Sequence, residues 1–403
     1  MFLKDALRIV ARLQREDLGK SEKTVKRELL EKIDIDLPFA AVISGVRRCG
    51  KSTLLKQLTK ETKTFYYFNF EDSKIAGFEL SDFQRLDETL TEEFGENGVY
   101  FFDEIQNIPK WELFVREKLD KKRHFVITGS NASLLSKELG TRLTGRHLRF
   151  ELFPFSFTEF LKFKEKKASV ESFEEYLSKG GFPEYLKNER DGILQELLND
   201  IMARDIIVRY GLRNLKTLRE LAVYLLSNIG KEFSYTKLKE TFQLGSVNTA
   251  ISFISYFEDS YLLFTVPRFD YSLKKQQANP KKIYAIDNGF AKVNSITFSK
   301  DRGKMLENAV FLQLRRNFRD IYYYSGKKEC DFLIKEKEKI TQAIQVCYEL
   351  TEENKEREIN GLLEAMEKFK LKKGMILTLK QKDEIKQADK TIIVKPAWEW
   401  LKG

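Results

Sequence analysis

The sequence of 403 residues is poor in the side chains that build disulfides and zinc sites. It has three cysteines, Cys49, Cys330 and Cys347, and two histidines, His124 and His147. Three widely spaced cysteines do not make a disulfide framework, and so few Cys and His residues argue against the clustered ligands of a structural zinc site. The chemistry of the chain therefore has to come from other side chains.

Long apolar runs are also missing. No stretch approaches the roughly 20 residues that a membrane-spanning helix needs, and residues 1–12 mix Lys4, Asp5 and Arg8 with apolar side chains. We therefore expect a cytoplasmic protein with no membrane partner. Hydrophobic residues make up 42% of the chain and charged residues 33%, which predicts a folded soluble protein of two or three domains.

Acidic residues are in the minority. The 71 basic and 61 acidic residues give a formal net charge of +10, and residues 281–403 hold 26 basic against 19 acidic residues. This excess suits a polyanionic partner, and we expect that partner to be DNA bound with low sequence specificity. Plain solvation of a charged surface is the alternative.

The most informative stretch covers residues 45–53. It follows an apolar run at 40–43 and opens a helical pattern at 54–58, which is the strand, loop and helix setting of a P-loop. The backbone N–H groups of such a loop and the N-terminus of its helix form a nest for phosphates, so we predict ATP and Mg²⁺ as cofactors. The residues predicted to bind the nucleotide are Gly45, Arg47, Arg48, Cys49, Gly50, Lys51, Ser52 and Thr53.

Individual roles follow from the chemistry of the loop. Gly45 permits a sharp turn, and Gly50 lets the backbone approach the phosphate. Lys51 supplies positive charge and is placed among the catalytic residues, while the Ser52 hydroxyl is the expected ligand of Mg²⁺. A glycine turn that carries a lysine and binds no ligand is the alternative.

A second motif ends a predicted strand. The apolar residues 99–102 lead into Asp103 and Glu104, about 50 residues after the P-loop. At the carboxyl end of a parallel strand beside the P-loop, Asp103 is placed to hold Mg²⁺ through water and Glu104 to polarise the attacking water. The alternative is that the two acids merely terminate the strand.

Two further polar positions follow. The strand at 125–128 ends near Asn131, which is predicted either to sense the γ-phosphate or to cap the next helix. Arg146, with Arg142 as the other choice, is predicted to be an arginine finger that reaches a neighbouring subunit, or else to form an intrachain ion pair. A finger would make the protein a homo-oligomer, with a hexamer as one form.

These motifs together resemble the AAA-family ATPases of bacteria and archaea that carry a C-terminal domain of unknown function. The resemblance covers nearly the whole chain and implies an AAA+ core with a P-loop ATPase mechanism. It does not define a physiological role. The segments that carry it are residues 45–53, 102–106, 128–131, 145–156, 180–184, 204–206, 284–289 and 306–308.

The next region predicts a DNA-binding module. Helical patterns at 218–229, 237–242 and 247–259, with a turn at 244–246 and a strand at 262–266, have the spacing of a winged helix. The predicted recognition helix contains no Lys or Arg, so DNA binding would rest on the wing and the basic residues after it, and the alternative is a module that only packs against protein. Those basic residues are Arg268, Lys274, Lys275, Lys281 and Lys282.

The last third resembles a restriction-endonuclease-like fold. Glu307 on a helix and Asp331 on a strand match the acids of such nucleases, but Gln345 stands where a second strand acid is needed and Cys347 where a lysine is needed. We therefore interpret this as a degenerate site and nuclease activity as unlikely unless a lysine such as Lys327 or Lys328 takes that place.

The overall prediction is an α/β protein in four parts. These are an AAA+ core with an N-terminal helical arm (1–160), a helical lid or connector (161–215), a winged helix (216–275) and the degenerate endonuclease-like domain (276–403). The leading hypothesis is an ATP-hydrolysing motor or remodeller acting on DNA. The alternatives are a nucleotide-dependent switch or scaffold without DNA activity, and an ATP-gated nuclease.

Overall fold

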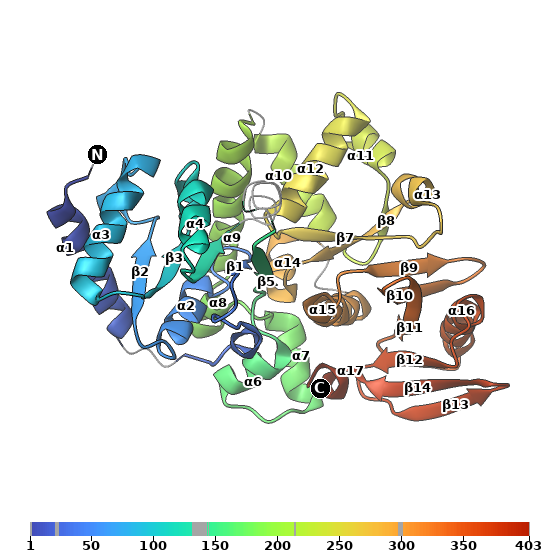
Figure 1. The fold of residues 1–403 in the computed structure, drawn as a ribbon. Coiled ribbons are helices and arrows are strands. Elements are labelled where there is room, and N and C mark those ends of the chain that lie inside the picture. Colours follow the sequence, from blue (N-terminus) through green and yellow to red (C-terminus); the bar gives the residue numbers. More distant parts are fainter. Residues whose placement is uncertain are drawn as a thin grey trace. The chain divides into compact units, whose positions relative to one another are not determined.

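The computed structural model in Figure 1 describes residues 2–20, 24–130, 143, 145–212, 215–296 and 301–402. The chain forms two compact units, Met1–Phe153 and Pro154–Gly403. Within the described ranges, no helix is long and apolar enough to cross a membrane.

The first unit is built on a five-stranded parallel sheet, as the sequence predicts (Figure 1). One strand, β4, lies between the P-loop strand β1 and the acid-bearing strand β3. The strands, in the order β2-β3-β4-β1-β5, are β2 (Phe65–Asn69), β3 (Val99–Asp103), β4 (Phe125–Gly129), β1 (Ala40–Ser44) and β5 (His147–Glu151).

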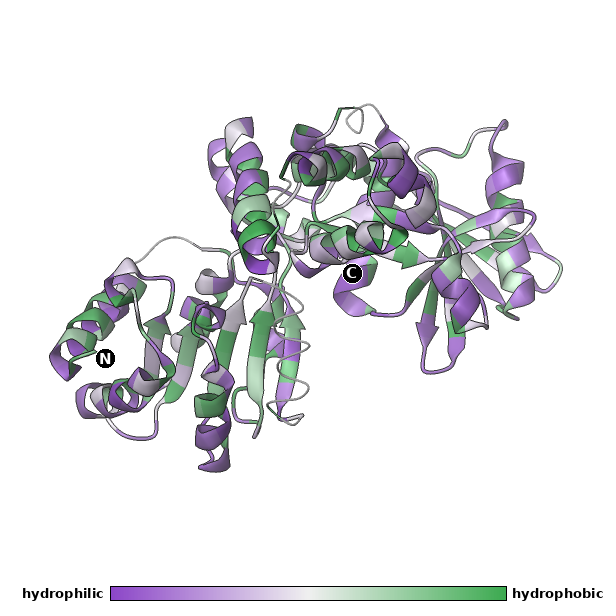
Figure 2. Cartoon of the chain, turned by 90° about the horizontal axis from the view of Figure 1, so that it is seen from above, coloured by the Kyte–Doolittle hydropathy of each residue, from purple (hydrophilic) through white to green (hydrophobic). Residues whose placement is uncertain are grey.

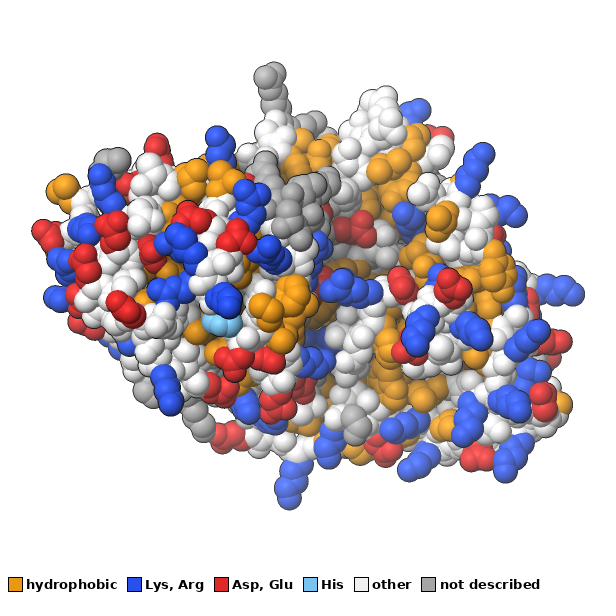
Figure 3. Space-filling view, viewed as in Figure 1, with side chains coloured by type: hydrophobic (Ala, Val, Ile, Leu, Met, Phe, Trp, Pro, Cys, Tyr) orange, Lys and Arg blue, Asp and Glu red, His pale blue; other side chains and the backbone are white. Residues whose placement is uncertain are grey.

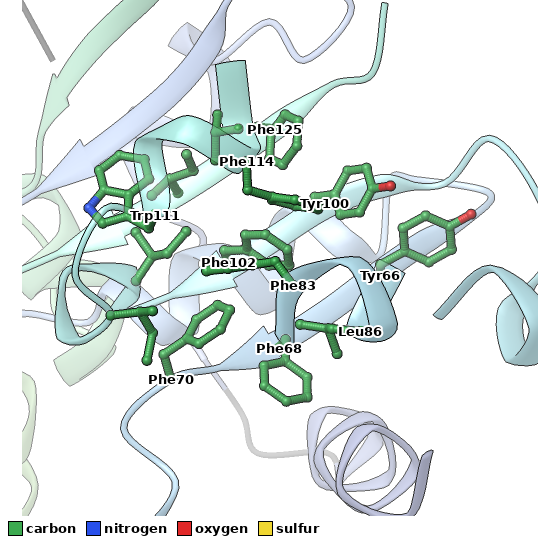
Figure 4. Packing of buried hydrophobic residues seen from close by; sticks show 14 of the residues in the cluster. Tyr66, Phe68, Phe70, Phe83, Leu86, Tyr100, Phe102, Trp111, Phe114 and Phe125 are labelled. Carbon is green, nitrogen blue, oxygen red and sulfur yellow. The ribbon is translucent and has the colours of Figure 1, made fainter. Parts of the chain in front are cut away.

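Aromatic side chains fill the core of this unit (Figure 4). Phe70 and Phe102 meet edge to face with ring centroids 5.2 Å apart, and Tyr100 stacks on Phe125 at 4.5 Å. The inner strands of a parallel sheet are covered on both faces and so consist of continuous hydrophobic runs, which Figure 2 shows as green strands. The helices of this unit are α1 (Lys4–Gly19), α2 (Lys51–Thr59), α3 (Phe83–Phe94) and α4 (Trp111–Asp120).

The predicted N-terminal helical arm is helical only in part. After α1, the chain reaches the short 3-10 helix η1 (Glu28–Lys32) through extended backbone at Arg27. The Arg27 amide donates to Gln57 on α2 at 3.1 Å, and its guanidinium donates to the Cys49 carbonyl at 2.7 Å. These tertiary contacts override the helical spacing of the apolar residues here.

The second unit begins with helices, in agreement with the helical pattern predicted up to residue 213. They are followed by a second group of helices and a three-stranded antiparallel sheet in the order β6-β8-β7. The first group is α6 (Phe157–Lys164), α7 (Val170–Lys179), α8 (Pro183–Asn188), α9 (Asp191–Asp200) and the π-helix η5 (Ile201–Val208). The second group is α10 (Leu215–Leu226), β6 (Glu232–Phe233), α11 (Tyr235–Thr241), α12 (Val247–Asp259), β7 (Leu263–Pro267), α13 (Leu273–Ala278) and β8 (Lys281–Ala285).

A mixed six-stranded sheet ends the chain, in the order β13-β14-β12-β11-β10-β9. The predicted boundaries at 160, 215 and 275 stay predictions, because the compact units divide only at Phe153. The elements are α14 (Asn288–Asn294), α15 (Arg302–Asn317), β9 (Ile321–Ser325), β10 (Glu329–Glu336), β11 (Lys339–Val346), α16 (Lys355–Lys368), β12 (Lys373–Thr378), β13 (Asp383–Gln387), β14 (Lys390–Pro396) and α17 (Ala397–Lys402).

A buried carboxylate connects the helices of the second unit. Asp287 accepts hydrogen bonds from the backbone N–H of Gly181 at 2.6 Å and of Phe290 at 2.8 Å. Burial raises the pKa of Asp287 to about 6, even though the backbone donors favour the charged form. The folded chain therefore binds this proton more tightly than the unfolded chain does.

This pKa predicts a pH dependence of stability. The contribution of Asp287 is fully present below pH 3.8, its ordinary pKa, and is lost as the pH rises to about 6, a change of ~3 kcal/mol at most in the free energy of unfolding. Asp287→Asn should remove that part of the slope between pH 4.5 and 6.5, measured by urea unfolding. The control is Asp301→Asn, at the N-cap of α15; parallel slopes for wild type and Asp287→Asn would contradict the prediction.

Candidate nucleotide-binding site

The P-loop has the backbone geometry that a phosphate nest requires. Gly50 precedes α2 with φ of 102°, a left-handed conformation that favours glycine. A Cβ atom on Gly45 would lie 2.2 Å from the Leu152 carbonyl oxygen, so no other residue fits there. The loop therefore brings bare backbone to the N-terminus of α2, where N–H groups are free to meet an anion.

Lys51 is buried at the centre of the site, with 5% of its side chain exposed. Its Nζ donates to the Gly45 carbonyl at 3.1 Å and lies 3.3 Å from Oε1 of Glu104. Burial acts to lower the pKa of Lys51, but the neighbouring Glu104 carboxylate outweighs it and raises that pKa above its ordinary value. The ammonium group is thus charged, and Glu104 balances it.

Asp103 is fully buried at the end of β3. The Thr128 hydroxyl at the end of β4 donates to its Oδ1, and the Tyr67 hydroxyl donates to Oδ2 at 3.2 Å. Burial and the nearby Glu104 charge raise the pKa of Asp103, and hydrogen bonds from Thr128 and Ser52 act in the opposite direction. The Ser52 contact joins the two residues predicted to hold Mg²⁺.

Glu104 follows directly in a left-handed conformation, with φ of 52°. Its backbone N–H donates to the Thr128 hydroxyl oxygen at 2.9 Å, and its Oε2 accepts from Nε2 of Gln106 at 2.5 Å. Burial opposes its charge, but Lys51, the Gln106 amide and Arg47 together hold the pKa of Glu104 below its ordinary value. Glu104 is therefore an ionised carboxylate, as a general base must be.

The remaining loop residues take different positions. Arg47 donates to Glu71 at 3.2 Å, whereas Arg48 is exposed. Cys49 is buried, and burial raises the pKa of its thiol. A cavity of about 450 Å³ opens beside Ser52 and Thr53. Its lining comes from α1, α2 and the end of β2: Gln14, Asp17, Leu18, Ser52, Thr53, Lys56, Tyr67, Asn69, Glu71 and Asp72.

Sequence reasoning missed two residues of this site. Thr128 fixes both acids, and Arg27 clamps the loop by donating to the carbonyls of Cys49 at 2.7 Å and Phe153 at 2.6 Å. Thr128 lies in the segment 128–131, and its position as a polar residue at the end of a strand was the signal that could have identified it. Arg27 carried no local signal, because its partners lie 22 and 126 positions away.

Three predicted residues are not part of the observed cluster. Asn131 and Arg142 lie outside the described residues. Arg146 lies just before β5, at the amino edge of the parallel sheet and away from the P-loop edge, where it pairs with Asp120. An intrachain pair was the alternative to an arginine finger, and the finger stays a prediction.

These residues fit a nucleotide phosphate with Mg²⁺. A buried carboxylate, Asp103, and a hydroxyl, Ser52, are hydrogen-bonded to each other, and hard oxygen donors of this kind suit Mg²⁺. The glycine backbone and the Lys51 ammonium complete an anion site beside them.

The degenerate nuclease-like residues also come together, in the second unit. Glu307 and Asp331 share the ammonium of Lys282 on β8, at 3.4 Å and 2.8 Å, and Glu307 also pairs with Lys304 on its own helix at 2.7 Å. The Tyr284 hydroxyl donates to Glu307 at 2.7 Å. Lys327 and Lys328, which we considered for that role, are exposed, and the lysine that contacts Asp331 comes from β8 instead.

Lys282 and its acidic partners Glu307 and Asp331 are buried. The side chain of Lys282 is 2% exposed and those of Glu307 and Asp331 are 5% and 7% exposed. Burial opposes its charge, but Asp331 and Glu307 raise the pKa of Lys282 well above its ordinary value. Gln345 accepts from the Asp331 amide at 3.2 Å and donates to Glu358 at 2.6 Å, so both ends of its amide group are engaged. The cluster has the character of a buried ion pair that joins β8 to α15 and β10.

Comparison with known proteins gives three matching family profiles. An AAA domain matches residues 38–161, and two domains of unknown function match residues 170–298 and 302–400. The uncharacterized protein MJ1544 of Methanocaldococcus jannaschii is 34% identical over 418 residues, covering 95% of this chain and 92% of that protein. An uncharacterized protein of Haemophilus influenzae is 29% identical over 371 residues, covering 87% and 92%.

One solved structure, that of AMPPCP-bound DnaA from Aquifex aeolicus, matches 62% of this chain and 88% of that chain. The sequence identity is 14% and the TM-score is 0.29, a similarity too low to support an argument about this protein.

Proposed function

Because the chain belongs to the AAA-family ATPases with C-terminal domains of unknown function, we propose that it hydrolyses ATP in this site and uses the energy to act on DNA. The observation that supports hydrolysis most directly is the buried pairing of Lys51 with the ionised Glu104 at 3.3 Å, beside Asp103 and Ser52. A phosphate-binding cation and a general base thus stand next to each other.

The proposed reaction uses these groups in order. The phosphates enter the nest at residues 45–52, and Lys51 turns from Glu104 toward their negative charge. Ser52 and Asp103 would hold Mg²⁺, which would offset the charge on the phosphate oxygens. Water then attacks the γ-phosphorus: its oxygen forms the new bond, its proton passes to Glu104, and the bond to the bridging oxygen breaks to leave ADP and phosphate.

The DNA part of the proposal is supported by topology. The order of the elements α10, β6, α11, α12, β7 and β8, with the sheet order β6-β8-β7, fits the pattern expected of a winged helix and so supports this part of the proposal. Ser234 caps α11 and Ser246 caps α12. The hairpin between β7 and β8, which carries α13, takes the place of the wing.

The structure corrects the list of basic residues available to DNA. Lys282 is buried in its ion pair, Arg268 donates to the Ser325 carbonyl, and Lys281 donates to the Tyr235 hydroxyl at 3.0 Å. Lys274 and Lys275 on α13 are exposed. On the face in Figure 3, Lys and Arg side chains are spread among acidic ones. We therefore propose α13 as the main phosphate contact.

Tyr271 and Leu273 strengthen this choice, because they are 78% and 74% exposed beside the two lysines. An exposed aromatic ring next to cations suits stacking on bases together with phosphate contacts, which gives binding without strong sequence preference.

The test is DNA binding by fluorescence anisotropy over a range of salt concentrations. Lys274→Glu/Lys275→Glu should weaken binding roughly 10-fold and reduce the slope of log K against log salt by about 2. Lys372→Glu/Lys373→Glu, another exposed adjacent pair, is the matched control and should change binding much less. Equal losses in both variants would contradict the role of α13, and no binding by wild type at low salt would favour a protein scaffold.

A further inference from the structure

We propose that Gln106 is a positioning residue of the hydrolytic site, holding the Glu104 carboxylate where it can take the proton of the attacking water. The inference rests on the ATP hydrolysis proposed above. Gln106 lies on the 3-10 turn η4 (Ile105–Asn107) that follows β3, and its Nε2 is 2.5 Å from Oε2 of Glu104. A carboxylate offers only acceptors, so the group in contact has to be the amide nitrogen, and this fixes the orientation of the Gln106 side chain.

The turn that presents these two residues is costly for stability. Glu104 adopts a left-handed backbone with φ of 52°, which is unfavourable for a residue with a Cβ atom. The other end of the Gln106 amide, its Oε1, is buried without a hydrogen-bond partner among the residues that the structure describes. Two unfavourable features within three residues indicate an arrangement kept for its effect on Glu104.

The two oxygen atoms of the Glu104 carboxylate have different partners, and this gives Gln106 its role. Oε1 faces Lys51 at 3.3 Å, and Oε2 faces Gln106. A bound phosphate attracts the Lys51 ammonium away from Glu104, since both compete for the same positive charge. Gln106 stands on η4 rather than on the P-loop, so its hydrogen bond does not depend on where Lys51 points. It therefore keeps the general base in place at the moment when Lys51 is engaged by the nucleotide.

The decisive variant is Gln106→Met, which keeps the length of the side chain and removes the amide. We expect kcat for ATP to fall on the order of 10- to 100-fold, with KM and nucleotide affinity unchanged. The melting temperature should stay the same or rise, because the buried unpartnered carbonyl is removed with the amide. The matched control is Asn107→Ala, at the next residue of the same turn. Asn107 is exposed and contacts the Phe70 carbonyl at 3.4 Å. The kcat of this variant should therefore match that of wild type.

Each possible outcome either supports or contradicts the positioning role of Gln106. A lower kcat with unchanged affinity and undiminished thermal stability supports the positioning role. If wild type hydrolyses ATP and Gln106→Met keeps the same kcat, or loses activity only in step with its melting temperature, this inference is overturned while the proposed function stands. A wild-type chain that binds but does not hydrolyse ATP overturns both.

Discussion

Replacing Glu104 with glutamine is expected to stop ATP turnover and to tighten ATP binding. The glutamine cannot take a proton from water, so kcat should fall about 10²- to 10⁴-fold. In the wild-type chain the phosphate has to draw Lys51 away from the carboxylate 3.3 Å from it, and Glu104→Gln removes that competing charge. The dissociation constant for ATP should therefore fall.

Steady-state phosphate release and anisotropy with a fluorescent ATP analogue measure the two effects separately. The control is Glu117→Gln, the same chemical change at a 53% exposed glutamate that pairs with Lys121. Lys51→Ala should behave in the opposite way and lose binding. If Glu104→Gln lost affinity and turnover together, Glu104 would be a structural partner of Lys51 and not the general base.

The part of this site that could be predicted from sequence is the part that is local in the chain. The P-loop and the Asp103-Glu104 pair were recognised because the strand, the turn and the polar residues follow one another within a few positions. The order of the strands was not accessible in this way. The strand β4 lies between β1 and β3, and its Thr128 hydroxyl donates to Asp103, a contact between strands that only the folded sheet shows.

In the second unit, too, local features could be predicted from the sequence and long-range contacts could not. The helices α11 and α12 were expected close to their observed bounds, because their helical patterns and the turn at 244–246 between them are local features of the sequence. Lys282 was assigned to a basic surface instead, as one of the basic residues that follow the predicted strand at 262–266. Its burial comes from Glu307 and Asp331, 25 and 49 positions further along the chain.

The strongest effect on the second unit is expected from Lys282→Met. The change leaves Glu307 and Asp331 buried without their shared ammonium, and breaking a buried ion pair on one side costs ~3–5 kcal/mol. Hydrogen exchange should show faster opening of β8 and β10, with peptides of the first unit unaffected. The control is Lys281→Met, at the preceding residue of β8. The Lys281 ammonium contacts the Tyr235 hydroxyl instead, so this change should have a much smaller effect.

Two further results separate an ion pair from a metal site here. Combining Lys282→Met with Glu307→Gln and Asp331→Asn should recover most of the lost stability, because the unpaired charges are then gone together with the lysine. In wild type the ammonium groups of Lys282 and Lys304 already face the two carboxylates, so removing divalent cations with EDTA should leave the exchange of β10 unchanged. If EDTA loosened β10, or if Lys282→Met left its exchange unchanged, Lys282 would not be the cation that holds Glu307 and Asp331 together.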